Sequence, residues 1–189
     1  QDNDLVELFC GDELVASGRP ANVELDVPDP PAFASAQKAS ARFRGFVSHF
    51  YPGCFVCGPE REHGDGLRIF AGPLEQGTGP QGMVAAAWVP DETLTDSLGL
   101  VAQEFIWAAL DCPGAYAFEE PKNAALLLGE LAVSRTGSVS AGENCVLTGW
   151  EISRQGRKNY TGTALFGESG SCCALGYATW FEVPSQAGQ

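Results

Sequence analysis

The most constraining feature of this chain is one apolar helical segment, residues 101–112, that lies among stretches of alternating, β-branched-rich sequence. Apolar residues recur there at intervals of three and four, the spacing of one helix face. Pro113 and Gly114 then end or kink the helix. The segment carries Asp111, a carboxylate among Phe, Ile, Trp, Ala and Leu. A charge in such surroundings is costly unless it is paired or used, so Asp111 is a candidate functional residue.

Strand-like patterns flank this helix on both sides. They occupy six segments: 67–70, 83–89, 125–134, 144–153, 158–166 and 172–183. The boundaries of these segments carry Gly, Asn or Ser residues, which are typical of turns. The element order from about residue 66 to residue 184 is therefore β-β-α-β-β-β-β. This order predicts an α+β fold in which an antiparallel β-sheet wraps around one central helix.

The first 50 residues are predicted to form a hairpin and a second helix. Residues 5–27 alternate around a turn at Gly11-Asp12, and a proline-rich break follows. Residues 32–46 then contain Ala, Gln, Lys and Arg, which helices tolerate. We therefore expect three parts, namely 1–50, a main domain over 51–184, and a tail at 185–189.

Charge and composition exclude several function classes. The chain has 189 residues and a formal net charge of −13, which argues against a nucleic-acid surface and against docking on an anionic membrane. Its 44% hydrophobic content fits a soluble globular protein, and no window approaches the roughly 20 apolar residues of a membrane span. The seven cysteines are an odd number and include the adjacent pair Cys172-Cys173, so we expect reduced thiols and a cytoplasmic location.

Three short motifs together cover about residues 52–184. Cys54-Phe55-Val56-Cys57-Gly58-Pro59 is followed by Gly66-Leu67-Arg68-Ile69, Trp107-Ala108-Ala109-Leu110-Asp111 lies on the predicted central helix, and Gly156-Arg157-Lys158 leads into a closing hairpin. In this element order the motifs resemble the hotdog-fold thioesterase superfamily, and in particular its acyl-CoA thioesterase-like members of the phenylacetate-pathway type. The resemblance implies a hotdog fold, a thioester substrate and Asp111 as the catalytic carboxylate.

The chain departs from the family at the start of the central helix. The His-Gly-Gly that the family usually carries there falls at Ala102-Gln103-Glu104, and none of the three residues matches. In relatives, a glycine N–H at this helix terminus helps to polarise the thioester carbonyl. Gln103 and Glu104 also have a backbone N–H, but Glu104 adds a negative charge where an oxyanion would form. Losing one such donor typically costs about 3 kcal/mol, so we expect an activity that is reduced or directed elsewhere.

Each candidate catalytic residue has a structural alternative. Asp111 is a nucleophile or general base, or else a helix-terminal Asp bonded to nearby backbone or to an arginine. Glu104 is a second acid, or a first-turn residue that complements the helix dipole. Gln103 donates to a substrate carbonyl, or it is simply exposed.

Substrate contacts are expected from five further residues. Trp107 lines an acyl or aryl pocket or belongs to the core, and Cys54 and Phe55 line a loop over the pocket. Arg157 and Lys158 are basic residues in an acidic protein, and they hold the coenzyme A phosphates or form a solvated turn.

The sequence favours no metal and no other cofactor, coenzyme A being part of the substrate. Zinc at the Cys-x-x-Cys pair Cys54 and Cys57 would need two more ligands, and only His49 and His63 are near in the chain. Both histidines fall outside the predicted helix and sheet. We therefore expect no Ser-His-Asp or Cys-His arrangement.

A faint repeat relates the N-terminal hairpin to residues 165–182. A chance likeness of two apolar hairpins and a true duplication both stay open. With a duplication, the first 50 residues would be the remnant of a first hotdog copy in a truncated tandem protein.

The leading hypothesis is an acyl-CoA thioesterase-like protein that hydrolyses a small or medium acyl or aryl thioester. The alternative is a non-catalytic hotdog module that binds an acyl or aromatic ligand. A small-molecule acyl thioester is the expected ligand, with neither nucleic acid nor membrane as partner. An exposed hairpin edge invites pairing, so a homodimer is expected.

Overall fold

The computed structural model describes residues 4–75, 82–119 and 124–184. Its strands and helices follow one another as β1 (Val6–Cys10), β2 (Glu13–Gly18), α1 (Phe33–Ser40), the 3-10 helix η1 (Arg44–Phe46), β3 (Gly72–Pro73), β4 (Val84–Trp88), the 3-10 helix η2 (Glu92–Leu94), α2 (Gln103–Ala109), α3 (Cys112–Ala115), β5 (Ala124–Arg135), β6 (Cys145–Gln155), β7 (Lys158–Phe166) and β8 (Cys172–Pro184). The α+β class is thereby confirmed, and the last four predicted strands are found within two residues of their expected bounds.

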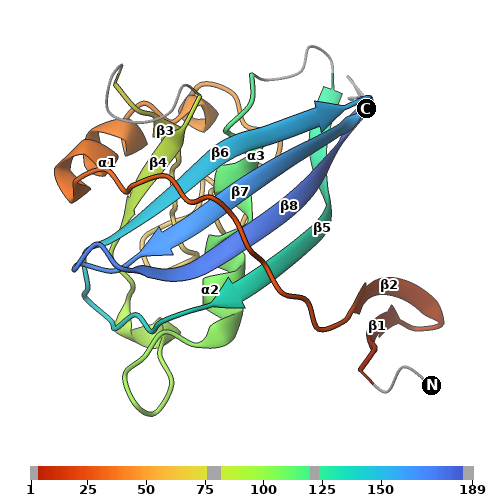
Figure 1. The fold of residues 1–189 in the computed structure, drawn as a ribbon, viewed down its shortest axis with the longest axis horizontal. Helices are drawn as coiled ribbons and strands as arrows, with labels where there is room; N and C mark the ends of the chain where they lie inside the picture. The colour runs from red at the N-terminus through yellow and green to blue at the C-terminus, as the bar shows by residue number, and fades with distance from the viewer. Residues whose placement is uncertain (1–3, 76–81, 120–123, 185–189) are drawn as a thin grey trace.

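One antiparallel sheet, in the order β3-β4-β6-β7-β8-β5, forms the body of the protein. The chain leaves β4, passes through α2 and α3 on one face, and returns as β5 at the far edge (Figure 1). The sheet curves around these helices (Figure 1), and its side chains alternate between the helix side and the opposite face. Ala86, Leu147 and Leu165 pack with Ile106 and Leu110 on the helix side.

The opposite face of the sheet is covered by the N-terminal segment. Ala36 and Ala39 of α1 are fully buried against Ala85 and Val146. The extended chain before α1 crosses this same face in front of β6, β7 and β8 (Figure 1). Helix α1 ends earlier than the predicted 32–46 helix, and η1 completes that span. The division into parts at residue 50 stays a prediction.

The hairpin β1-β2 behaves differently from the rest of the chain. Every residue in its two strands is exposed, and the strands pair with each other as a separate two-stranded sheet. The hairpin lies beside β5 but outside the main sheet (Figure 1). The predicted continuation of the hairpin to residue 27 is wrong, since the chain leaves the second strand at Gly18.

The predicted strand at 67–70 is also wrong, and its backbone explains why. Arg68 has a φ of 54°, in the left-handed region that interrupts an extended strand. The N–H groups of Leu67 and Ile69 instead donate to the carbonyls of Phe55 and Val56, at 2.8 Å each. Leu67 and Ile69 are buried, so the pattern correctly predicted their burial but not the element.

Candidate active site

The predicted central helix is broken at Asp111. Helix α2 ends at Ala109, Leu110 caps it, and α3 begins at Cys112. The hydroxyl of Thr163 on β7 donates to the Leu110 carbonyl at 2.9 Å, which satisfies one of the orphan carbonyls at the helix end. Pro113 stands in the first turn of α3, where its missing N–H costs nothing.

Two glycines let α3 lie directly on the sheet. A Cβ at Gly149 of β6 would stand 2.5 Å from the Pro113 carbonyl oxygen. A Cβ at Gly114 would stand 2.5 Å from the Thr161 hydroxyl on β7. Any larger residue at either place would force the short helix away from the strands, so this contact determines where Asp111 and Cys112 lie.

Asp111 is a half-buried carboxylate whose Oδ1 is sealed from solvent. This oxygen has no hydrogen-bond partner among the residues that the structure describes, and the side chain does not cap α3. Burial, together with the charge of nearby Cys54, raises the pKa of Asp111 to about 7. Buried polar atoms are normally satisfied, and the exceptions are concentrated at functional sites.

Three thiols gather next to this carboxylate. The sulfurs of Cys54, Cys57 and Cys112 all lie within 4.8 Å of one another, and those of Cys54 and Cys112 are 3.6 Å apart. Hydrogen bonds from Cys112 and Cys57 lower the pKa of the Cys54 thiol. The hydrogen bond to Cys54 in turn raises the pKa of Cys112. These hydrogen bonds therefore favour the negative charge of the cluster on Cys54.

A histidine joins the cluster, which corrects the expectation that the chain has no Cys-His arrangement. Nε2 of His49 lies 3.2 Å from the Cys57 sulfur and 2.9 Å from the Tyr116 hydroxyl. Its Nδ1 accepts the Tyr51 backbone N–H at 2.9 Å, so in the neutral ring Nε2 carries the proton. Burial lowers the pKa of His49, which favours that neutral ring.

These side chains form one wall of a small cavity of roughly 110 Å³. Among the residues that line it are His49, Cys54, Cys57, Cys112, Tyr116 and Trp180. Asp111 is not in the lining itself, but it immediately precedes Cys112 and is close enough to Cys54 for their charges to interact.

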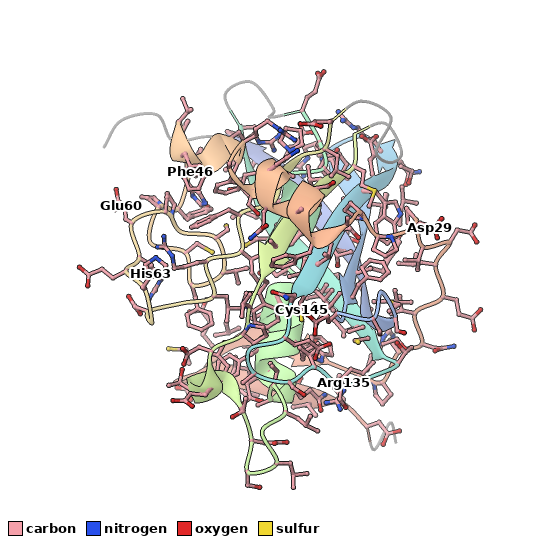
Figure 2. The ribbon with its side chains drawn as sticks, turned by 90° about the vertical axis from the view of Figure 1, so that its left-hand side faces the viewer. Asp29, Phe46, Glu60, His63, Arg135 and Cys145 are labelled. Atoms are coloured by element: carbon pink, nitrogen blue, oxygen red, sulfur yellow. The ribbon has the colours of Figure 1, made fainter. Side chains whose placement is uncertain are left out.

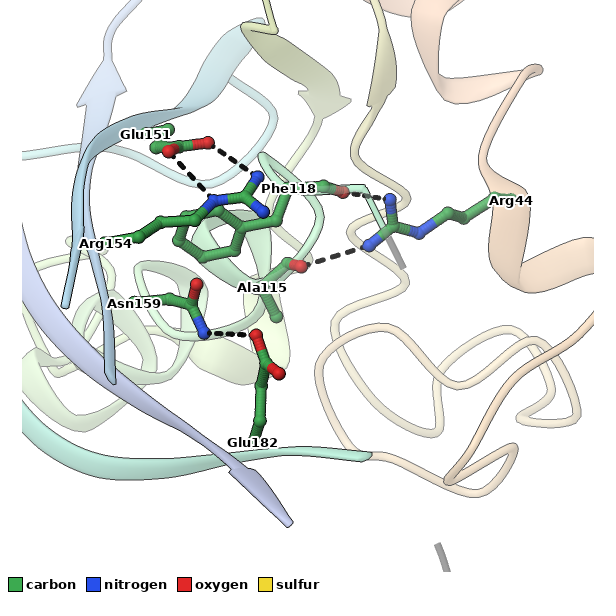
Figure 3. Close-up of polar contacts among 7 residues, drawn as sticks. All are labelled: Arg44, Ala115, Phe118, Glu151, Arg154, Asn159 and Glu182. Atoms are coloured by element: carbon green, nitrogen blue, oxygen red, sulfur yellow. Dashed lines mark hydrogen bonds and ion pairs between the residues drawn. The ribbon is translucent and has the colours of Figure 1, made fainter. Parts of the chain in front are cut away.

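Arg44, which the sequence did not indicate as a site residue, also lines this cavity. The Arg44 guanidinium donates to the carbonyls of Ala115, at 3.1 Å, and Phe118 (Figure 3). It also lies 4.9 Å from the centre of the Tyr116 ring. Arg44 thus ties the segment after α3 to the N-terminal part of the chain.

The other predicted site residues are spread over the molecule. Gln103 and Glu104 are exposed at the opposite end of α2, about 10 Å from Asp111 at 1.5 Å per residue. Trp107 is 38% exposed and lines a groove between β5 and the N-terminal hairpin. Phe55 is 40% exposed in a further groove, where it packs against Phe105. Of the predicted substrate contacts, Cys54 is the one whose charge acts on Asp111.

The basic residues lie in the exposed turn between β6 and β7. Lys158 Nζ stands 5.4 Å from the centre of the Phe181 ring, and the Arg157 carbonyl accepts the N–H of Glu182. Arg154 nearby is held by both carboxylate oxygens of Glu151, at 2.8 and 2.9 Å (Figure 3). Its pairing with Glu151 makes Arg154 a weak candidate for phosphate binding, and Arg157 and Lys158 remain the candidates.

Comparison with known proteins supports the fold. No protein-family model matches the sequence, and no curated protein matches it. Among solved structures, a phenylacetic acid degradation-related protein from Ralstonia eutropha JMP134 matches with a TM-score of 0.54 and 18% identity, over 62% of this chain and 86% of that one. A thioesterase from Haemophilus influenzae matches with a TM-score of 0.54 and 12% identity, over 65% and 83%.

A third solved structure is a hypothetical thioesterase from Streptococcus pneumoniae TIGR4 with coenzyme A, which matches with a TM-score of 0.50 and 8% identity, over 55% of this chain and 83% of that one. Identities this low establish shared architecture only. The chain therefore shares the fold of these solved structures, which is the hotdog fold that the three motifs predicted. In the described ranges, no helix has the length and apolar character needed to cross a membrane.

Proposed function

We propose that the protein is an acyl-CoA thioesterase-like enzyme in which Asp111 acts as the general base. The observation that carries this proposal is the sealed, unpartnered Oδ1 of Asp111 at the end of the central helix, beside a cavity. A carboxylate with one unbonded oxygen is free to take a proton from a reacting group, and its raised pKa lies near neutral pH, where a general base works best. The hotdog fold, shared with solved thioesterases, adds support.

The proposed reaction is hydrolysis of a thioester. Asp111 takes a proton from water while the water oxygen attacks the thioester carbonyl carbon. The tetrahedral intermediate then collapses, the carbon–sulfur bond breaks, and the proton passes from Asp111 to the leaving thiolate. The cavity of roughly 110 Å³ suits a small acyl group. Coenzyme A is proposed as the thiol because the Streptococcus pneumoniae thioesterase was solved with it.

Other parts of the site stay predictions. Arg157 and Lys158 are proposed to hold the coenzyme A phosphates, since both are exposed. Trp107 and Phe55 are proposed to contact the rest of the substrate from their grooves. Gln103 and Glu104 are the weakest candidates because α2 separates them from Asp111. A homodimer is still expected, since β5 lies at the edge of the sheet and pairs only with β8 among the described strands.

The test measures, by chromatography, the release of free coenzyme A from a panel of acyl and aryl thioesters. Wild-type protein should hydrolyse at least one of them, and Asp111→Asn should lower kcat/KM by about 10²- to 10⁴-fold, the usual contribution of a general base. The matched control is Asp29→Asn, an exposed aspartate on the other side of the molecule from the loop with His63 (Figure 2). Equal rates for wild type and Asp111→Asn would refute the role.

A second candidate is the non-catalytic ligand-binding module. Two observations favour it, namely the replacement of His-Gly-Gly by Ala102-Gln103-Glu104 and the position of Asp111 behind the cavity wall. Thermal stabilisation of the protein by an acyl-CoA without any turnover would support this candidate, and turnover that Asp111→Asn abolishes would exclude it.

A further inference from the structure

We propose that Cys54, Cys57 and Cys112 bind one thiophilic metal ion of the Zn²⁺ class at the wall of the cavity. The three sulfurs lie within 4.8 Å of one another, and those of the free thiols Cys54 and Cys112 are 3.6 Å apart. Two sulfurs bound to tetrahedral zinc at about 2.3 Å lie about 3.8 Å apart. The cluster therefore needs only small shifts to surround an ion. This inference does not depend on thioester hydrolysis.

The loop that carries two of the ligands has the form of a metal-binding turn. Gly58 N–H donates to the Cys54 carbonyl at 2.9 Å, and a Cβ at Gly58 would stand 2.5 Å from that oxygen. A turn of this kind presents two thiolates to one ion, as in structural zinc sites with a Cys-x-x-Cys pair.

The third ligand comes from the distant α3. Cys112 stands at the start of that helix, and its sulfur meets the loop 58 residues away in sequence. The expectation that only nearby histidines could complete a zinc site missed this thiol. His63, one of those histidines, lies exposed on the outer loop (Figure 2). An ion held by both segments would tie the loop 54–57 to the helix that follows Asp111.

His49 belongs to the outer shell of this proposed site. Its Nδ1 accepts the Tyr51 N–H, so Nε2 donates its proton toward the Cys57 sulfur at 3.2 Å rather than offering a lone pair to an ion. Such donors orient metal ligands and tune their charge. The fourth coordination position is then left for water or a small ligand from the cavity, which all three thiols line.

The experiment uses the full chain, purified under reducing conditions and freed of metal with a chelator. Zn²⁺ is titrated in competition with a chromophoric chelator, and Co²⁺ is added in a parallel sample. We expect one ion per chain, together with the visible bands of tetrahedral Co²⁺ and the near-ultraviolet absorption of cobalt–thiolate bonds. The intensity of that absorption should correspond to three thiolates.

Variants then locate the ion. Cys54→Ser, Cys57→Ser and Cys112→Ser should each weaken Zn²⁺ binding by at least tenfold and reduce the cobalt–thiolate absorption, while Cys172→Ser, outside the cluster, should change neither. His49→Gln should leave both the thiolate absorption and the visible Co²⁺ bands in place. A shift of the visible bands would instead show that Nε2 is a ligand. Circular dichroism checks that each variant folds.

Three results would overturn the proposal. One is a reduced wild-type chain that takes up no Zn²⁺ or Co²⁺ at one equivalent, which no folding defect of a variant can explain. Another is binding that survives the loss of all three thiols. The last is a cluster that forms a Cys54–Cys112 disulfide in the metal-loaded sample, seen as the loss of two hydrogens by mass spectrometry.

Discussion

Candidate catalytic residues lie at both ends of α2, but one end is exposed and the other is buried. At the first end, Gln103 and Glu104 are exposed, and the Ala102 cap offers no side-chain hydrogen bond. At the second end, Leu110 is fully buried and Asp111 has a sealed oxygen beside a thiol cluster. The helix itself is the same for both. What differs is the packing of the sheet, so the strands beneath the helix decide which of its ends is buried.

The largest effect on stability should come from removing the contact that places the buried end. Gly149→Ala would set a methyl group 2.5 Å from the Pro113 carbonyl oxygen, and backbone cannot move aside easily. We expect a loss of about 3 kcal/mol in the free energy of unfolding, measured by urea denaturation, at the high end of overpacking costs. Gly18→Ala, where no atom lies within 4 Å of the added group, is the matched control. Comparable free energies of unfolding for both variants would show that the close contact at Gly149 does not determine where α3 lies.

Two buried threonines test whether a hydrogen bond to the end of α2 stabilises the fold. Thr163 and Thr148 are both fully buried, but Thr163 donates to the Leu110 carbonyl and the Thr148 hydroxyl has no partner among the described residues. Thr163→Val should lower the free energy of unfolding by about 2 kcal/mol, because a buried carbonyl is left unsatisfied.

Thr148→Val removes an unsatisfied hydroxyl from the same sheet, so it should be neutral or slightly stabilising. Chemical denaturation of the two variants side by side gives the difference directly. If Thr148→Val were the more damaging change, the support of α2 by Thr163 would not be what holds this end.

The smallest effect is expected at the exposed end. Gln103→Ala removes a side chain that is open to solvent, so the free energy of unfolding should stay within roughly 0.5 kcal/mol of wild type. The rate of thioester hydrolysis should also stay within about twofold. A large fall in rate at unchanged stability would show that the first end of α2 takes part in catalysis after all.

Much of this fold could be predicted because its signals are local. Strands β5 to β8 are apolar-rich segments between clear turns, and the central helix has its own periodicity. The run at 67–70 shows where such reasoning fails. Its side chains are as apolar as those of a strand, but Arg68 adopts a left-handed backbone and the N–H groups pair within a loop.

The site was predictable only in part, because only some of its signals are local in sequence. Asp111 stands out because its immediate neighbours in sequence are apolar, which is a local signal. The thiol cluster depends on Cys112 meeting a loop 58 residues away, and His49 joins only through the packing of the N-terminal segment. Spacing in the sequence does not predict a contact made by tertiary structure, so nothing in the sequence links Cys57 with Cys112.

The central claim is that the buried end of α2, and not the exposed end, carries the acting carboxylate. The most direct test measures kcat/KM of Asp111→Asn and Glu104→Gln with the best acyl thioester found for the wild-type protein. Both substitutions replace an acid by its amide on the same helical segment. We expect kcat/KM to fall by about 10²-fold or more for Asp111→Asn and by less than about threefold for Glu104→Gln. Equal losses, or a larger loss at Glu104, would contradict it.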